Sequence, residues 1–215
     1  EDNNVDIKRL YLLACRYGNI DNIKCLLSRG VDINSANDIG KTAIEIAAEN
    51  NQNEVLNYLL DNVAEVKGRN GTNYNDILTY SVKNDNYEIT KLLITNYNNN
   101  LNLNNALKVA AMNGSKSLKA LLDAGISPDY NINSNEALLQ YSCLSGNYSG
   151  AKILLEYGAS VNEPCGYPLL NAVQSGNTDC VKLLCDYNVD VNFNTTSDMD
   201  RTSILFYAVR HGYLD

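Results

Sequence analysis

The stretch that decides the fold runs from Ala14 to Asn34. It reads ACRYGN at residues 14–19, KCLL at 24–27 and GVDIN at 30–34. A similar order returns at residues 142–162 and 172–192, and further copies occur elsewhere in the chain. The first small residues of the seven copies are at positions 14, 47, 81, 110, 142, 172 and 208, in steps of 29 to 36 residues. Self-similarity at such a period indicates a stacked repeat architecture.

Each copy has the physical features of two short helices joined by a tight turn. Apolar residues recur at helical spacing up to a pair of small residues, and small side chains let neighbouring helices approach closely. A Gly then ends the first helix, because Gly adopts the left-handed conformation without strain. Asn51 and Asp85 replace this Gly in two copies and also tolerate positive φ, whereas Val63 at the end of a second helix does not, so we expect that turn to change shape.

This pattern of small pair, Gly-Asn turn, double Leu and Gly-x-Asp-x-Asn loop resembles the ankyrin repeat. The resemblance implies an all-α repeat solenoid of stacked helix-turn-helix units with extended β-hairpin-like loops. We expect one array over residues 1–215, with a last unit that is incomplete and belongs to a fragment of a longer protein. The expected units are 5–36, 37–69, 70–99, 100–130, 131–162, 163–196 and 197–215.

The departures from the family pattern are also informative. The Thr-Pro-Leu-His start of the ankyrin repeat survives only in part, as Thr42-Ala43-Ile44-Glu45 and as Pro168-Leu169-Leu170, and the His is missing at this position of every unit. Its hydrogen bonds must therefore be replaced or lost. The shortest step and a deletion near Ser117 lead us to expect the stack to bend or loosen between about 95 and 106.

Composition excludes several classes of partner. The chain carries 25 acidic and 17 basic residues, which gives a net charge of −8 and a pI near 4.7. Neither nucleic acid nor an anionic bilayer would be attracted to a surface of the same sign. No apolar run approaches the roughly 20 residues that cross a membrane, and residues 1–4 do not resemble a secretion signal, so we expect no membrane insertion. The 34 Asn residues suggest an AT-rich genome.

The sequence offers little for catalysis or metal binding. Its six Cys have no Cys-x-x-Cys spacing, and the single His211 lies beside a Gly at a predicted helix end. We interpret Cys15, Cys143 and the cysteines of the second helices, Cys25, Cys180 and Cys185, as small apolar fillers, and Cys165 as the most exposed thiol. We therefore expect a protein that is not an enzyme and has no cofactor and no metal site.

Positions for a partner follow from the repeat geometry. Each unit presents the tip of its extended loop and the exposed end of its first helix, and in a stack these positions line one concave surface. Large apolar groups at such positions, as at 17, 112 and 144, favour an interface. The candidate partner-binding residues are Arg16, Tyr17, Asp38, Ile39, Lys41, Glu49, Asn50, Lys83, Met112, Tyr130, Leu144, Gln174 and Met199.

Two functions remain open. The first is a non-catalytic protein–protein interaction module that binds another protein rigidly on its concave loop and helix surface, and the net charge predicts a partner with a basic or mixed face. The alternative is a regulatory or substrate-recruiting arm of a larger enzyme or ubiquitin-ligase adaptor, a role that the resemblance permits. Unpaired Cys and the lack of a signal favour an intracellular, cytoplasmic setting, although export as an effector by a non-classical route stays open. We expect the fragment to be monomeric.

Overall fold

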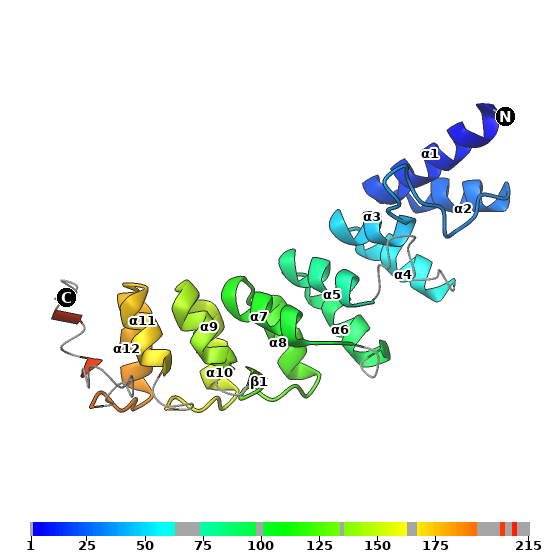
Figure 1. The fold of residues 1–215 in the computed structure, drawn as a ribbon. Coiled ribbons are helices and arrows are strands. Elements are labelled where there is room, and N and C mark those ends of the chain that lie inside the picture. Colours follow the sequence, from blue (N-terminus) through cyan, green and yellow to red (C-terminus); the bar gives the residue numbers. More distant parts are fainter. Residues whose placement is uncertain are drawn as a thin grey trace. The chain divides into compact units, whose positions relative to one another are not determined.

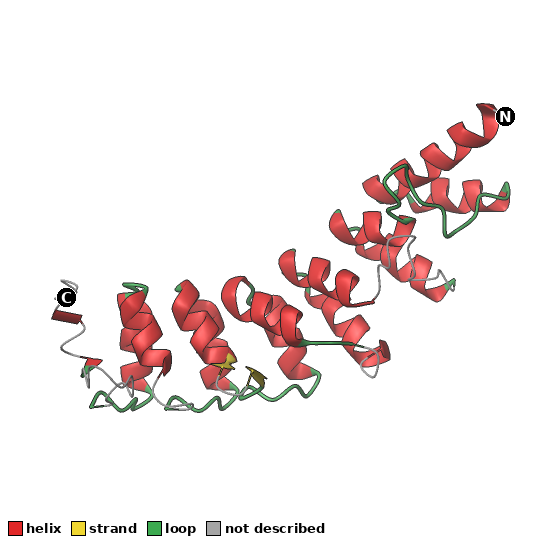
Figure 2. Ribbon diagram, in the orientation of Figure 1, coloured by secondary structure: helices red, strands yellow, loops and turns green. Residues whose placement is uncertain are grey.

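The computed structural model describes residues 2–62, 74–97, 101–133, 136–162, 167–192, 203–204 and 208–209. Its described part consists mainly of short helices that follow one another in pairs (Figures 1 and 2). The chain divides into two compact units, Glu1–Leu103 and Asn104–Asp215, and the division falls inside the interval 95–106. The predicted all-α repeat solenoid is confirmed.

The described part of the first unit contains three helix pairs. The first helix of each pair contacts the first helix of the next pair, so α1, α3 and α5 form one row. In the row of second helices, α4 contacts α6. The pairs are α1 (Asp2–Tyr17) with α2 (Ile20–Ser28), α3 (Ala43–Glu49) with α4 (Asn53–Asp61), and α5 (Tyr74–Lys83) with α6 (Tyr87–Tyr97).

The second unit repeats this arrangement. Helix α9 contacts both α7 and α11, and α10 contacts both α8 and α12. A short antiparallel hairpin of β1 (Asn131–Asn133) and β2 (Glu136–Ala137) precedes α9, as the β-hairpin-like loops predict (Figure 2). The helix pairs are α7 (Asn104–Asn113) with α8 (Lys116–Asp123), α9 (Leu138–Ser145) with α10 (Tyr148–Glu156), and α11 (Tyr167–Gln174) with α12 (Thr178–Asp186).

The turn residues chosen from the sequence adopt the expected conformation. Gly18 and Gly146 have φ of 77° and 69°, and their substitutes Asn51 and Asp85 have φ of 58° and 49°. Asn188 ends α12 with φ of 59°, a left-handed position that the sequence analysis did not identify. Val63 lies outside the described residues.

The small pairs lie at the centre of the packing. The first small residues Ala47, Ala110, Ser142 and Ala172 are all fully buried. Small side chains let adjacent helices pack closely, so each helix pair contributes to an apolar core that continues through its unit.

In one repeat, the hydrogen bonds of the missing His are replaced by those of another side chain. Glu45, which stands at the His position, is buried, and its carboxylate accepts hydrogen bonds from the backbone N–H of Thr42 at 2.7 Å and from the Thr42 hydroxyl at 2.8 Å. This contact closes the start of α3 in the manner of a capping box.

Asn side chains connect consecutive repeats in the second unit. The Oδ1 of Asn147 caps α10 by accepting from the Gly150 N–H at 3.1 Å, while its Nδ2 donates to the carbonyls of Ala111 at 2.9 Å and Gly114 at 3.2 Å in the preceding repeat. Asn177 does the same one repeat later, since it caps α12 and donates to the Gly146 carbonyl. One side chain therefore satisfies a helix end and a neighbouring turn together.

The cysteines divide into two groups. Cys15, Cys143 and Cys180 are buried, which confirms the filler interpretation, whereas Cys25 and Cys185 are exposed, so that interpretation is wrong for them. The reason is helical register, because α2 buries Ile23 and Leu26 and leaves position 25 on its outer face. Cys165 lies outside the described residues.

We expect iodoacetamide at mildly alkaline pH to modify Cys25 and Cys185 in the folded protein and to leave Cys15 and Cys143 unmodified. Burial raises the pKa of the Cys15 thiol to about 12, and a hydrogen bond with Cys180 together with burial raises that of Cys143. Peptide mass mapping before and after addition of denaturant measures the difference. Equal labelling of Cys15 and Cys25 in the native state would contradict the described packing.

Candidate functional site

A hollow of the first unit lies between α1, the loop after α2, and α3. It has a volume of about 1110 Å³ and is called here the α1–α3 groove. Its lining consists of Lys8, Arg9, Leu12, Leu13, Arg16, Gly30, Val31, Asp32, Ser35, Asn37, Asp38, Ile39, Lys41, Ile46, Glu49 and Asn50.

One wall of the groove is a finger formed by residues 35–43. Its backbone is closed by hydrogen bonds from the Gly40 N–H to the Asn37 carbonyl and from the Asn37 N–H to the Lys41 carbonyl, each 2.9 Å. The Asn37 side chain accepts a further bond from the Lys41 N–H at 2.9 Å, and Gly40 supplies the positive φ of 84° that the turn requires. The finger thus holds Asp38 and Ile39 at its tip, and Ile39 is 67% exposed.

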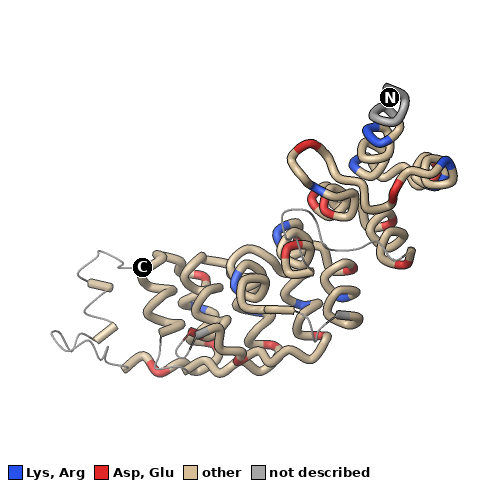
Figure 3. The backbone as a smooth tube through the Cα atoms, turned by 45° about the vertical axis from the view of Figure 1, so that its right-hand side comes forward, with Lys and Arg blue, Asp and Glu red and all other residues tan. Residues whose placement is uncertain are grey.

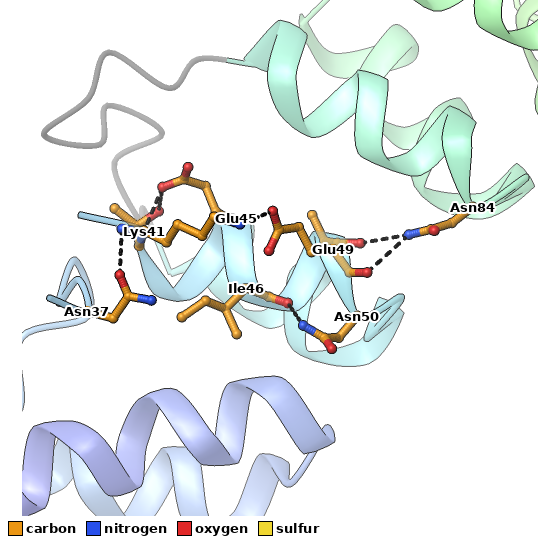
Figure 4. A network of polar contacts seen from close by, with 9 residues as sticks. Asn37, Lys41, Glu45, Ile46, Glu49, Asn50 and Asn84 are labelled. Carbon is orange, nitrogen blue, oxygen red and sulfur yellow. Dashed lines mark hydrogen bonds and ion pairs between the residues drawn. The ribbon is translucent and has the colours of Figure 1, made fainter. Parts of the chain in front are cut away.

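The base of the finger is attached to α3 by a polar network (Figure 4). The ammonium group of Lys41 pairs with the carboxylate of Glu49, and this hydrogen bond raises the pKa of Lys41. Asn50 donates to the Ile46 carbonyl at 2.8 Å, and Asn84 donates to the carbonyls of Ala48 and Glu49. The C-terminal end of α3 is consequently held from both sides.

The opposite wall is one face of α1. Leu12 and Ile46 are buried, Val31 is half-buried, and together they give the groove an apolar floor. The Tyr11 hydroxyl donates to the Ile33 carbonyl at 2.9 Å, which fixes the loop after α2 against α1. Burial raises the pKa of this Tyr, so the hydroxyl stays protonated and remains a donor.

The structure brings together about half of the residues predicted from the sequence. Those that line the α1–α3 groove are Arg16, Asp38, Ile39, Lys41, Glu49 and Asn50. Lys41 and Glu49 are half-buried in their mutual ion pair and offer a partner less charge than expected. Tyr17 is 71% exposed and lies on a smaller hollow with Leu10 and Cys25, while Lys83 is exposed at the end of α5.

The predicted residues of the second unit are more scattered. Leu144 is exposed as expected and lines a hollow of about 350 Å³ with Tyr141 and Tyr167. Gln174 is exposed, and Met112 is half-buried, so less of its side chain is accessible than at Leu144. Tyr130 is half-buried because its hydroxyl donates to the Asn104 Oδ1 at 2.9 Å, and Met199 lies outside the described residues.

Most of the α1 wall of the groove was not predicted. Only the last residues of each first helix were chosen, here Arg16, whereas Leu12 and Lys8 continue the face of Arg16 one and two turns earlier. Their spacing of four residues is the signal that could have identified them, because such residues share one helix face.

The matches to known proteins agree with this architecture. The family model for ankyrin repeats in three copies matches residues 3–70, 78–165 and 139–215. The chain therefore belongs to the ankyrin repeat family, whose repeats are generally non-catalytic modules for protein–protein interaction.

Individual relatives match only parts of the sequence. The ankyrin repeat protein YahD of Escherichia coli (strain K12) is 36% identical over 84 residues, which is 39% of this chain and 41% of YahD. The ankyrin repeat and KH domain-containing protein mask of Drosophila melanogaster is 40% identical over 76 residues, 34% of this chain and 2% of mask. The matches thus span less than half the length of either relative.

A solved structure shows the same fold. The human ASB11 ankyrin repeat domain superimposes with a TM-score of 0.72 at 19% identity, covering 94% of this chain and 96% of that domain. Among the described residues, no three or more His, Cys, Asp or Glu side chains are arranged to hold a metal ion, and no helix has the length and apolar character of a membrane span.

Proposed function

We propose that this chain is a non-catalytic module that binds a partner protein in the α1–α3 groove and on the neighbouring concave surface. The observation that supports the proposal most strongly is that six of the predicted positions, from one loop tip and two helix ends, line this hollow together. Ankyrin repeats are generally interaction modules, and the groove combines an apolar floor with a polar rim, as protein interfaces do.

The mechanism is rigid presentation. The finger is closed by its own hydrogen bonds, and its base is attached to α3 through the Lys41–Glu49 pair. A surface that is already ordered loses little conformational entropy when a partner binds, so more of the contact energy appears as affinity.

A second function is that the chain forms the regulatory or substrate-recruiting arm of a larger protein, such as an enzyme or a ubiquitin-ligase adaptor. The match to mask supports only the general idea of an arm in a larger protein, because that relative combines ankyrin repeats with a KH domain. We further propose an intracellular, reducing location, since all five described cysteines are free thiols.

Site-specific cross-linking tests the first proposal. We expect that replacing Ile39 with photoreactive benzoylphenylalanine gives a cross-linked partner protein on irradiation in cells, because Ile39 projects from the finger into the proposed interface. Asp61, which is exposed at the end of α4 and lines no described hollow, is the matched position in the same unit. Cross-links from position 61 with none from position 39 would contradict the proposal.

A further inference from the structure

We infer that the α1–α3 groove selects a partner segment in which acidic side chains flank an apolar one. This inference rests on the proposed function and assigns the chemistry of the partner. It opposes the expectation from net charge, which predicts a basic or mixed partner for the chain as a whole.

The α1 wall carries a local concentration of cations. Lys8, Arg9 and Arg16 all line the groove and are exposed, and the backbone of α1, which begins at the end marked N, carries blue segments in Figure 3. Among the side chains that the structure describes, none of the three forms an ion pair. Lys41, the fourth cation of the lining, is instead neutralised by Glu49. The charges available to a partner on this wall are therefore positive.

The side of the groove that faces α1 carries negative charge. Asp32 and Asp38 line the groove there, and the Asp32 carboxylate already accepts a hydrogen bond from the Asn34 N–H at 2.9 Å. Like charges repel across an interface, so an acidic partner side chain is directed towards α1 and away from the finger. This separation of charge fixes the orientation of the bound segment as well as its composition.

The apolar centre lies between the cations along α1. Leu12 and Leu13 occupy the turn between Arg9 and Arg16, and Val31 and Ile46 complete the floor. Seven residues of helix span about 10 Å, a distance that an extended segment covers in about three residues. The geometry therefore favours two carboxylates about three residues apart with an apolar side chain between them.

A nucleic acid is a poorer occupant of the same cations. Besides Glu49, which is paired with Lys41, two carboxylates, Asp32 and Asp38, line the groove, and the whole chain has a net charge of −8. Closely spaced phosphates would approach these carboxylates, whereas a peptide can place its few charges along one wall only.

Selection of peptides on the whole chain tests the inference. We expect a phage-displayed random peptide library to yield binders enriched in Asp or Glu on both sides of an apolar residue. In fluorescence anisotropy, the combined change of Lys8→Glu, Arg9→Glu and Arg16→Glu should weaken a selected peptide by at least about tenfold, because attraction becomes repulsion. The matched control is Lys116→Glu, Lys119→Glu and Lys182→Glu, three exposed residues outside the described hollows, and it should leave binding unchanged.

The outcomes separate this inference from the proposed function. If the selected peptides are neutral or basic and no longer bind the Ile39→Asp variant, the inference about acidic partners is overturned, and the groove remains the binding site. Failure to obtain any binder that depends on Ile39 would count against both. Competition by a single-stranded DNA oligonucleotide that also depends on the three cations would overturn the choice of a peptide. Circular dichroism of each variant verifies that its helices are intact.

Discussion

Leu154→Ala is expected to lower the free energy of unfolding by about 2–5 kcal/mol, because the change removes a buried side chain and leaves a cavity. Leu154 is completely buried in α10, a helix that contacts α8, α9 and α12 within the second unit. In a stack of repeats each helix pair depends on its neighbours for burial, so the loss is felt beyond a single helix. Urea denaturation followed by circular dichroism measures the change.

Leu144→Ala is the matched control, since it makes the same chemical change at a residue that is 47% exposed in α9. We expect it to alter the free energy of unfolding by less than about 1 kcal/mol. If the two variants lost equal stability, the division between core and exposed surface in the second unit would be wrong.

The second large effect is expected for Asn147→Ala, which should lower the free energy of unfolding by about 2 kcal/mol. The change removes the helix cap of α10 and also the donor to the Gly114 carbonyl in the preceding repeat. The Ala111 carbonyl keeps a hydrogen bond from the Ser142 hydroxyl at 2.8 Å, so one of the two acceptors remains satisfied. Thermal and urea unfolding both report the loss.

Asn19→Ala provides the comparison for that variant. Asn19 caps α2 by accepting from the Asn22 N–H at 3.0 Å, in the first repeat of the chain. We expect Asn19→Ala to lower the free energy of unfolding by about 1 kcal/mol, because it removes the helix cap alone. A cost at Asn147 no larger than that at Asn19 would show that the bonds between repeats contribute nothing measurable.

The helix pairs and their turns could be predicted from sequence because each depends on local chemistry. Asn51 and Asp85 were identified as substitutes for Gly, and both have positive φ. Asn188 was not predicted, although the same rule applies to it, since it also has positive φ. Cys25 and Cys185 were misplaced because apolar composition of a helix does not specify which face is covered.

Asparagine shows the limit of composition as a guide. The abundance of Asn was attributed to genome bias, yet Asn147 and Asn177 each connect two repeats through both ends of one amide. Such a role depends on the position of the neighbouring repeat, and a single repeat taken alone contains no sign of it.

The groove was predicted only in part for a similar reason. Asp38 and Ile39 were identified because loop tips are exposed in every repeat, whereas Lys8 and Arg9 belong to the groove only through the face of α1 that the finger meets. Tyr130 was expected at a free loop tip, but its hydroxyl is bound to Asn104. Contacts between distant segments decided each of these cases.

Hydrogen exchange by mass spectrometry, with and without a peptide selected on the whole chain, tests the central claim most directly. If the α1–α3 groove is the binding site, backbone amides of residues 35–42 and of α1 exchange more slowly in the complex, and those of α11 and α12 do not change. Protection confined to α11 and α12, with unchanged exchange in the finger, would contradict the claim.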